Sequence, residues 1–102
     1  MDNEPKNQQI QVKVSDEVLK GIYANSLMVS HNPEEFVLDF MSIFPNSPAA
    51  VIGSRLVLSP GNMKRIVSVL TENVKNYEKS FGEIKAQPAP ESGHKMGFRT
   101  EE

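Results

Sequence analysis

The apolar residues between positions 9 and 58 fall in four short runs of the kind that forms strands. In the first run, QIQVKV at 9–14, Ile10, Val12 and Val14 alternate with polar residues, which is typical of a strand with one face in water. IYANSLMVS (22–30), EFVLDFMSIF (35–44) and AAVIGSRLVL (49–58) follow and are rich in β-branched and aromatic residues. The connections are short, whereas parallel pairing needs a crossover of about a dozen residues or more. The pattern therefore predicts a four-stranded antiparallel meander.

Turn-forming residues separate these runs. SDEVLKG (15–21) predicts a single helical turn, with Ser15 as its N-cap and Gly21 leaving it through a positive φ. HNPE (31–34) and PNSP (45–48) are typical turn sequences.

After Ser59 the apolar period changes to alternating steps of four and three. Ser59 is suited to an N-cap, Pro60 to the first helical position and Gly82 to a C-terminal stop. One stripe runs along this predicted helix: Met63, Val67, Leu70, Val74, Tyr77 and Phe81, widened by Ile66 and Val69. We expect the helix to lie on the sheet through this stripe, although the same spacing also suits a seam with the helix of a second chain.

Register assigns the strand residues to two faces. With 31–34 as a hairpin loop, Ser30 lies opposite Glu35, and one nearly all-apolar face forms the bed for the helix. Tyr23, Leu27, Val29, Phe36, Leu38, Phe40, Phe44, Ile52, Leu56 and Leu58 lie on it. The other face is too apolar for water alone, so the sequence predicts that it pairs with a second copy around a two-fold axis. The predicted interface residues are Met28, Val37, Met41, Ile43, Val51 and Val57.

Asp39 and Arg55 fall opposite each other on that second face, with Ser26 on the neighbouring strand. An arginine partner lowers the pKa of a carboxyl, whereas a general acid needs its pKa raised. We therefore interpret Asp39 and Arg55 as a structural ion pair.

No other residues form a recognisable catalytic or metal-binding pattern. The chain has two histidines, no cysteine, no G-x-S-x-G elbow and no phosphate-binding glycine motif. We expect no enzymatic activity, no cofactor and no metal site. Lys64 and Arg65 near the helix start could contact phosphates, although the acidic residues Glu72 and Glu78 are interleaved with the basic ones further along.

Composition places the chain in a broad class. The formal charge of −2 supplies no long-range attraction for nucleic acid or an anionic bilayer. The N-terminal residues lack the basic-then-apolar order of a signal peptide, and no apolar run approaches the about 20 residues of a membrane span. With no cysteine, these features favour a soluble, cytoplasmic protein. We predict a flexible N-terminus at 1–8, one domain at 9–84 and a disordered tail at 85–102.

Several strings resemble a known family. G-I-Y-A-N at 21–25, EFVLDF at 35–40, S-R-L-V-L-S-P at 54–60 and the Asn73–Ile84 segment with Y-E-x-x-F-G-x-I are similar to a family of roughly 100-residue bacterial and archaeal proteins of unknown function. That resemblance implies no activity, cofactor or site residue. The order of four strands and a long helix is also similar to SecB-like export chaperones, which form dimers and tetramers and hold unfolded chains. The likeness is one of topology, and SecB has more helices.

Taken together, the sequence predicts an α+β domain in which a four-stranded antiparallel meander is followed by one long C-terminal helix. We expect a non-enzymatic homo-oligomeric binding or scaffold protein, dimeric or larger, with a protein or peptide as a further partner. The alternative is a nucleic-acid-associated protein that binds through Lys64 and Arg65.

Overall fold

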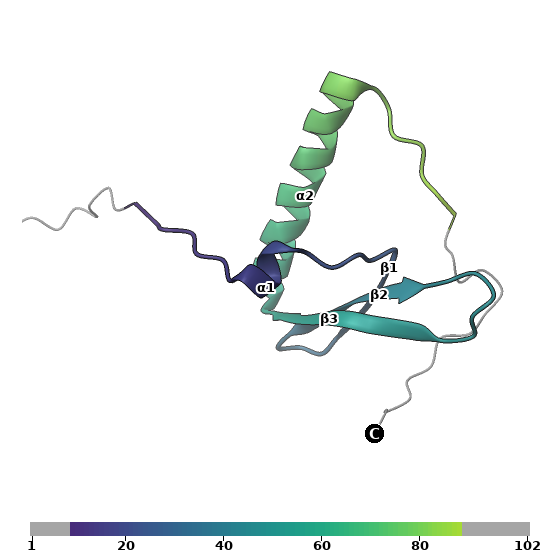
Figure 1. Ribbon diagram of the computed structural model, residues 1–102. Coiled ribbons are helices and arrows are strands. Elements are labelled where there is room, and N and C mark those ends of the chain that lie inside the picture. Colours follow the sequence, from purple (N-terminus) through teal and green to yellow (C-terminus); the bar gives the residue numbers. More distant parts are fainter. Residues whose placement is uncertain (1–8, 89–102) are drawn as a thin grey trace, which may run out of the picture.

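The computed structural model describes residues 9–88 and confirms the α+β class (Figure 1). The element order is α1 (Asp16–Leu19), β1 (Ser26–His31), β2 (Phe36–Ile43), β3 (Ala50–Leu58) and α2 (Pro60–Phe81). The predictions for 1–8 and for most of 85–102 concern residues that lie outside the described range.

The sheet is an antiparallel meander in the order β1-β2-β3. His31 pairs with Phe36, so the hairpin loop is 32–35 and the register differs by two residues from the predicted one. The reason is Asn32, whose side-chain oxygen accepts hydrogen bonds from the backbone N–H groups of Glu34 (2.8 Å) and Glu35 (3.0 Å) and so begins the turn one residue later. A shift of two residues keeps every side chain of β1 and β2 on its predicted face.

Two faces of the sheet can therefore be named. Alternate residues of a strand share a face, so Leu38 and Phe40 lie on one face and Asp39 and Met41 on the other. Phe40 lines a hollow together with α1 residues, and α1 and α2 lie on the same side of the sheet (Figure 1). We therefore call the face of Leu38 and Phe40 the α2-side face and the other the opposite face. Met28, not Ser26, lies opposite Asp39.

A β-bulge divides β3. Phe40 pairs with Ser54, whereas Met41 pairs with Ile52, so Gly53 is an extra residue without a partner on β2. An extra residue reverses the alternation beyond it, so Ile52 shares the opposite face with Met41, and Val51 turns to the α2 side opposite Ser42. The predicted faces of Ile52 and Val51 were therefore wrong.

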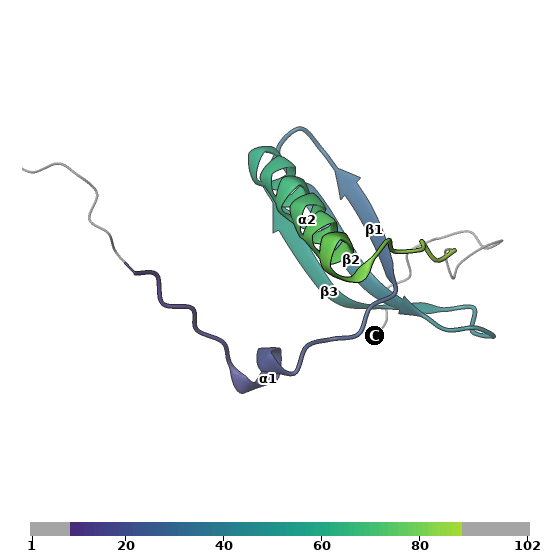
Figure 2. The same cartoon turned by 90° about the horizontal axis from the view of Figure 1, so that it is seen from above.

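The N-terminal segment does not join the sheet. Residues 9–14, the first predicted strand, run away from the sheet as an extended trace (Figures 1 and 2). The chain then makes α1, whose N-cap Ser15 accepts from Val18 N–H, and leaves it at Gly21 with φ 76°, as predicted. Among the described residues, the meander has three strands.

Helix α2 begins and ends where its caps predict. The Ser59 side chain accepts from Asn62 N–H, Pro60 occupies the first turn, and Gly82 ends the helix with φ 98°. The helix nevertheless does not lie on the sheet, because Ser59 alone separates β3 from α2 and no loop turns the helix back. It rises steeply from the end of β3, and its far end is remote from the strands (Figure 1). The prediction that α2 covers one sheet face was wrong for the single chain.

The core of the single chain is consequently small. In the described part of the chain, the buried residues are Leu38, Met41, Ile43 and Asp39, all on β2. β2 is the central strand and has β1 and β3 as its neighbours. No residue of the other described elements is fully buried.

Candidate functional site

The apolar stripe of α2 is mostly uncovered in the described chain. Only Met63 and Ile66, near the base of the helix, are half-buried. Residues three and four apart share a helix face, so the rest of the stripe continues on the side where these two are sheltered. Leu70 is 59% exposed and Phe81 is 75% exposed. The rings of Tyr77 and Phe81 lie beside each other, with centroids 4.9 Å apart. The helix thus presents a continuous apolar surface to water.

The α2-side face of the sheet is also incompletely covered. On its flanking strands Leu27, Val29 and Leu56 remain 43–48% exposed. Figure 2 shows α2 standing over this face, and Figure 1 shows that the two separate toward the far end of the helix. We call these two surfaces together the apolar wedge. Its members are Leu27, Val29, Leu56, Val67, Leu70, Val74, Tyr77 and Phe81.

Of the six residues of the predicted interface, all but Val51 lie on the opposite face, as expected, and their exposure varies. Met41 and Ile43 are 3% and 7% exposed, so the chain itself already buries them. Met28 and Val37 are half-buried. Val57 is exposed on this face, and Val51 is exposed but turned to the α2 side by the bulge. The uncovered apolar surface therefore lies mainly on the helix side of the sheet.

Asp39 and Arg55 meet across β2 and β3. Arg55 Nε donates to Asp39 Oδ1 at 2.6 Å and Nη2 donates to Oδ2 at 2.9 Å, a two-pronged pairing that suits guanidinium and carboxylate. Asp39 is 2% exposed, while the Arg55 side chain is 54% exposed. The hydrogen bond from Arg55 lowers the pKa of Asp39 below its ordinary value, although burial acts in the opposite direction. The carboxylate stays ionised at neutral pH and pairs two strands, and it is not available as a general acid.

Sequence reasoning missed the role of Asn25. Its side-chain amide donates to the carbonyl of Ile43 at 2.8 Å, and its side-chain oxygen accepts from the N–H of Ile43 at 2.9 Å. The side chain thereby completes the ladder at the end of β2, while Tyr23 carbonyl accepts from the Ser42 hydroxyl at 3.0 Å. An asparagine inside an apolar run, where β-propensity is low, was the signal that could have found it.

One open hollow lies between α1 and the sheet. It measures about 380 Å³ and is lined by Glu17, Val18, Gly21, Ile22, Ala24, Phe40 and Ser54. Glu17 is its one titratable side chain, so no second group stands by to share proton transfer. No group of three or more potential metal ligands occurs in residues 9–88.

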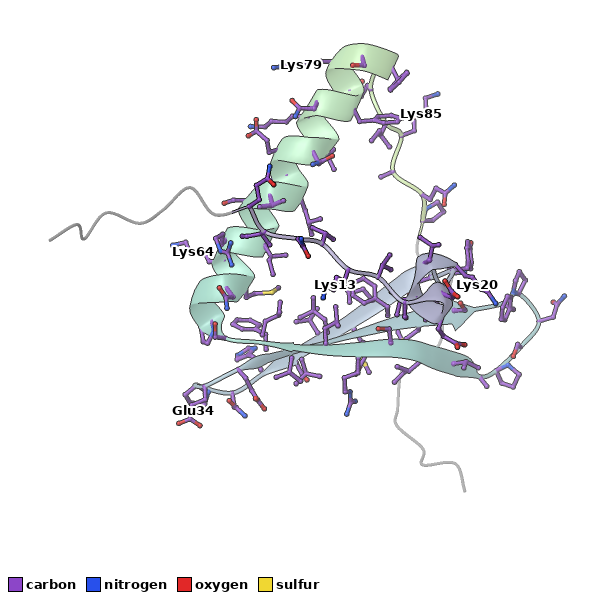
Figure 3. The ribbon with its side chains drawn as sticks, turned by 60° about the vertical axis from the view of Figure 1, so that its left-hand side comes forward. Lys13, Lys20, Glu34, Lys64, Lys79 and Lys85 are labelled. Atoms are coloured by element: carbon purple, nitrogen blue, oxygen red, sulfur yellow. The ribbon has the colours of Figure 1, made fainter. Side chains whose placement is uncertain are left out.

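Lys64 and Arg65 are exposed near the base of α2. Arg65 Nη2 donates to the side-chain oxygen of Asn62 at 3.0 Å. Figure 3 shows Lys64 near the base of the helix and Lys79 near its far end, so these two charges do not gather in one patch. No aromatic pair suited to stacking bases flanks Lys64 or Arg65 along the helix.

Comparison with protein families found a match over residues 1–86 to the family described as Protein of unknown function (DUF3467). The chain belongs to this family. Comparisons with curated proteins and with solved structures found no match. The family description names no activity, so any function of this DUF3467 member has to be argued from its geometry.

The strings that carry the resemblance hold architectural residues in this DUF3467 chain. G-I-Y-A-N includes Asn25, EFVLDF includes Asp39, and S-R-L-V-L-S-P includes Arg55 together with the cap of α2. Each of these residues fixes a strand pairing or a helix end. Across the described residues, no helix is both long and apolar enough to cross a membrane.

Proposed function

We propose that the chain is a cytoplasmic, non-enzymatic, homo-oligomeric binding or scaffold protein whose copies join through the apolar wedge. The observation that carries the proposal is the exposed stripe of α2. Large, contiguous apolar surfaces on a folded chain mark interaction sites. The interface predicted from sequence on the opposite face is thereby moved to the helix side.

Energetics favours an assembly over a lone chain. A fully buried large apolar side chain contributes about 1.5–3 kcal/mol, and only three such side chains are buried in the described chain. Ordering the backbone costs about 1–2 kcal/mol per residue. A second copy is the simplest source of the missing cover, because it is present wherever the chain itself is.

The stripe suits such a partner. Its steps of four and three from Met63 to Phe81 are the spacing of helices that pack along one seam. Covering the exposed half of one such side chain contributes about 1 kcal/mol, and association costs about 4–15 kcal/mol. The helix stripe alone therefore barely offsets association, and the exposed sheet residues Leu27, Val29 and Leu56 have to be covered as well.

A surface of this kind can also hold extended polypeptide. If the copies leave part of the wedge open, its aliphatic and aromatic side chains would bind apolar segments of an unfolded chain, in the manner of SecB-like chaperones. Glu17 is the one titratable side chain that lines the hollow, and the charge of Asp39 is paired with that of Arg55. Both observations support a non-enzymatic role.

The test combines mass with client binding. Light scattering on the purified chain should give a dimer or larger at micromolar concentration. The chain should then suppress the aggregation of insulin whose disulfides are reduced by dithiothreitol. The reductant does not affect the chain itself, because the chain has no cysteine. A monomer mass would overturn the oligomeric proposal, and unchanged insulin aggregation at stoichiometric excess would remove the peptide-holding role.

The nucleic-acid alternative rests on the exposure of Lys64 and Arg65. It predicts retention of single-stranded DNA or RNA that weakens with salt. Replacing both residues with glutamate should abolish that retention, and unchanged retention would dismiss these two residues as the contact.

A further inference from the structure

Residues 9–14 have the sequence pattern of a β-strand but belong to no sheet in the single chain. Ile10, Val12 and Val14 alternate with Gln9, Gln11 and Lys13, as in a strand with one apolar face. Ile10 is 89% exposed and Val12 is 90% exposed. The backbone runs away from the sheet and pairs with none of its strands (Figure 2). The segment therefore lacks both partners that its sequence pattern requires, a neighbouring strand and an apolar cover.

The outer edge of β3 lacks a partner strand. β3 pairs with β2 on one side and has no strand neighbour on its other side within residues 9–88. It is nine residues long, enough to pair with all six residues of 9–14. Unpaired edges are ordinarily protected by charges or by proline. The one charged side chain of β3, Arg55, is directed to Asp39, and Leu56 and Val57 beside the edge are exposed.

The path of the chain directs the segment away from its own sheet. Asn25 is fixed to Ile43, and Ile22 reaches β3, where its Cγ2 lies 3.1 Å from the position that a Cβ on Gly53 would take. α1 then carries the chain outward beyond the β3 side, and 9–14 continue in that direction (Figure 2). To pair with its own β3, the chain would have to reverse within α1, whose turn is closed by the Leu19 N–H to Ser15 carbonyl bond at 2.9 Å.

We propose that residues 9–14 of one copy add as a fourth strand to the outer edge of β3 of a second copy, reciprocally across a two-fold axis. This inference rests on the proposed homo-oligomer and states which backbone groups hold it together. It also supplies the strand that the sequence predicts and that the single chain does not contain. Main-chain hydrogen bonds give an added strand its affinity, and alternate side chains give it register.

Nuclear magnetic resonance on mixed copies tests the proposal directly. Equal amounts of ¹³C,¹⁵N-labelled and unlabelled chain are co-refolded, and isotope-filtered NOEs are recorded. The expected result is a series of contacts between Hα atoms of 9–14 in one copy and of 50–58 in the other. Every second amide of 10–14 should also exchange slowly, because an edge strand bonds on one side only.

The outcomes separate this inference from the proposed function. A dimer in which 9–14 show no NOE to 50–58, or only NOEs within one copy, overturns the strand exchange and leaves the homo-oligomer standing. A monomer at all concentrations overturns both.

A pair of proline variants provides an independent check. Val12 is almost fully exposed in the single chain, and Gln11 precedes it in the unpaired segment, so we expect neither Q11P nor V12P to disturb the protomer. Adjacent N–H groups point to opposite sides of a strand. One of the two variants should weaken self-association tenfold or more and the other far less. V12T, which keeps the β-branch, is the matched control. Equal, unchanged association in both proline variants would contradict the added strand.

Discussion

Strand β2 and helix α2 both carry a regular apolar pattern, but they differ in how far the single chain buries it. β2 contributes all four buried residues of the described chain, whereas the stripe of α2 has no fully buried member. β2 is central, so its neighbours on both sides shield it without any long-range docking. α2 follows β3 with no turn between them, so it projects away from the apolar sheet face that it could otherwise cover. Apolar periodicity thus predicts that a face will be buried, but it does not predict whether the same chain or another chain buries it.

The largest effect should come from a charge placed in the α2 stripe. L70E puts a carboxylate at the centre of the proposed seam, where burying an unpaired charge is very unfavourable. We expect self-association to weaken at least a hundredfold, measured by sedimentation equilibrium. S68E adds the same charge on the far side of the helix and should leave the mass unchanged. Equal behaviour of the two variants would contradict a seam along α2.

The matching change in β2 should act inside the chain itself. L38A removes buried methyl groups from the central strand and should cost about 2–5 kcal/mol of folding stability, measured by urea unfolding. L70A on the helix should lower stability through association, so its deficit should shrink as protein concentration rises, while that of L38A should not. If the loss of stability in L70A did not depend on protein concentration, α2 would act within the single chain as β2 does, and the proposed difference between them would be contradicted.

A smaller loss should follow from removing the Asn25 bridge. N25A leaves both backbone groups of Ile43 without their side-chain partner and should cost about 1–3 kcal/mol. N32A, which loses the turn contacts at the opposite end of β2, is the comparison variant. Because Asn25 is half-buried and Asn32 is exposed, N25A should be the more destabilising of the two in thermal unfolding.

The smallest expected effect is a change in the pH dependence of stability, and it concerns Asp39. Arg55 lowers the folded-state pKa of Asp39 below its ordinary 3.8. This contribution to stability is therefore complete above that ordinary value and is lost as pH falls through the lowered one. Acid unfolding followed by circular dichroism should be less steep in D39N than in the parent chain. E34Q, which changes an exposed turn residue, should retain the parent's steepness.

The sequence predicted the local features and missed those that depend on three-dimensional placement. Ser59, Pro60 and Gly82 defined α2, and the alternation along β2 assigned its faces, because both signals are local. The hairpin register was wrong by two residues because Asn32, not His31, begins the turn. The bulge at Gly53 reversed Val51 and Ile52, and an isolated glycine in a strand was its only warning.

The position of the uncovered apolar surface could be predicted only in part. Counting apolar residues against one helix indicated that some apolar surface would lack cover, and the apolar wedge is exposed in the structure. That a second copy covers it stays a prediction. The predicted interface included Met41 and Ile43, which are already buried within the chain. The direction in which α2 leaves β3 decides which face stays open, and no side-chain period encodes that direction.

The central claim is that this fold is completed by a second copy, and sedimentation equilibrium coupled to unfolding tests it most directly. The mass of the folded chain is measured from high micromolar to low nanomolar concentration while circular dichroism follows its structure. We expect a dimer or larger at the upper end, and loss of structure together with loss of mass on dilution. A monomer that stays folded at every concentration, with an unfolding midpoint independent of concentration, would contradict the account.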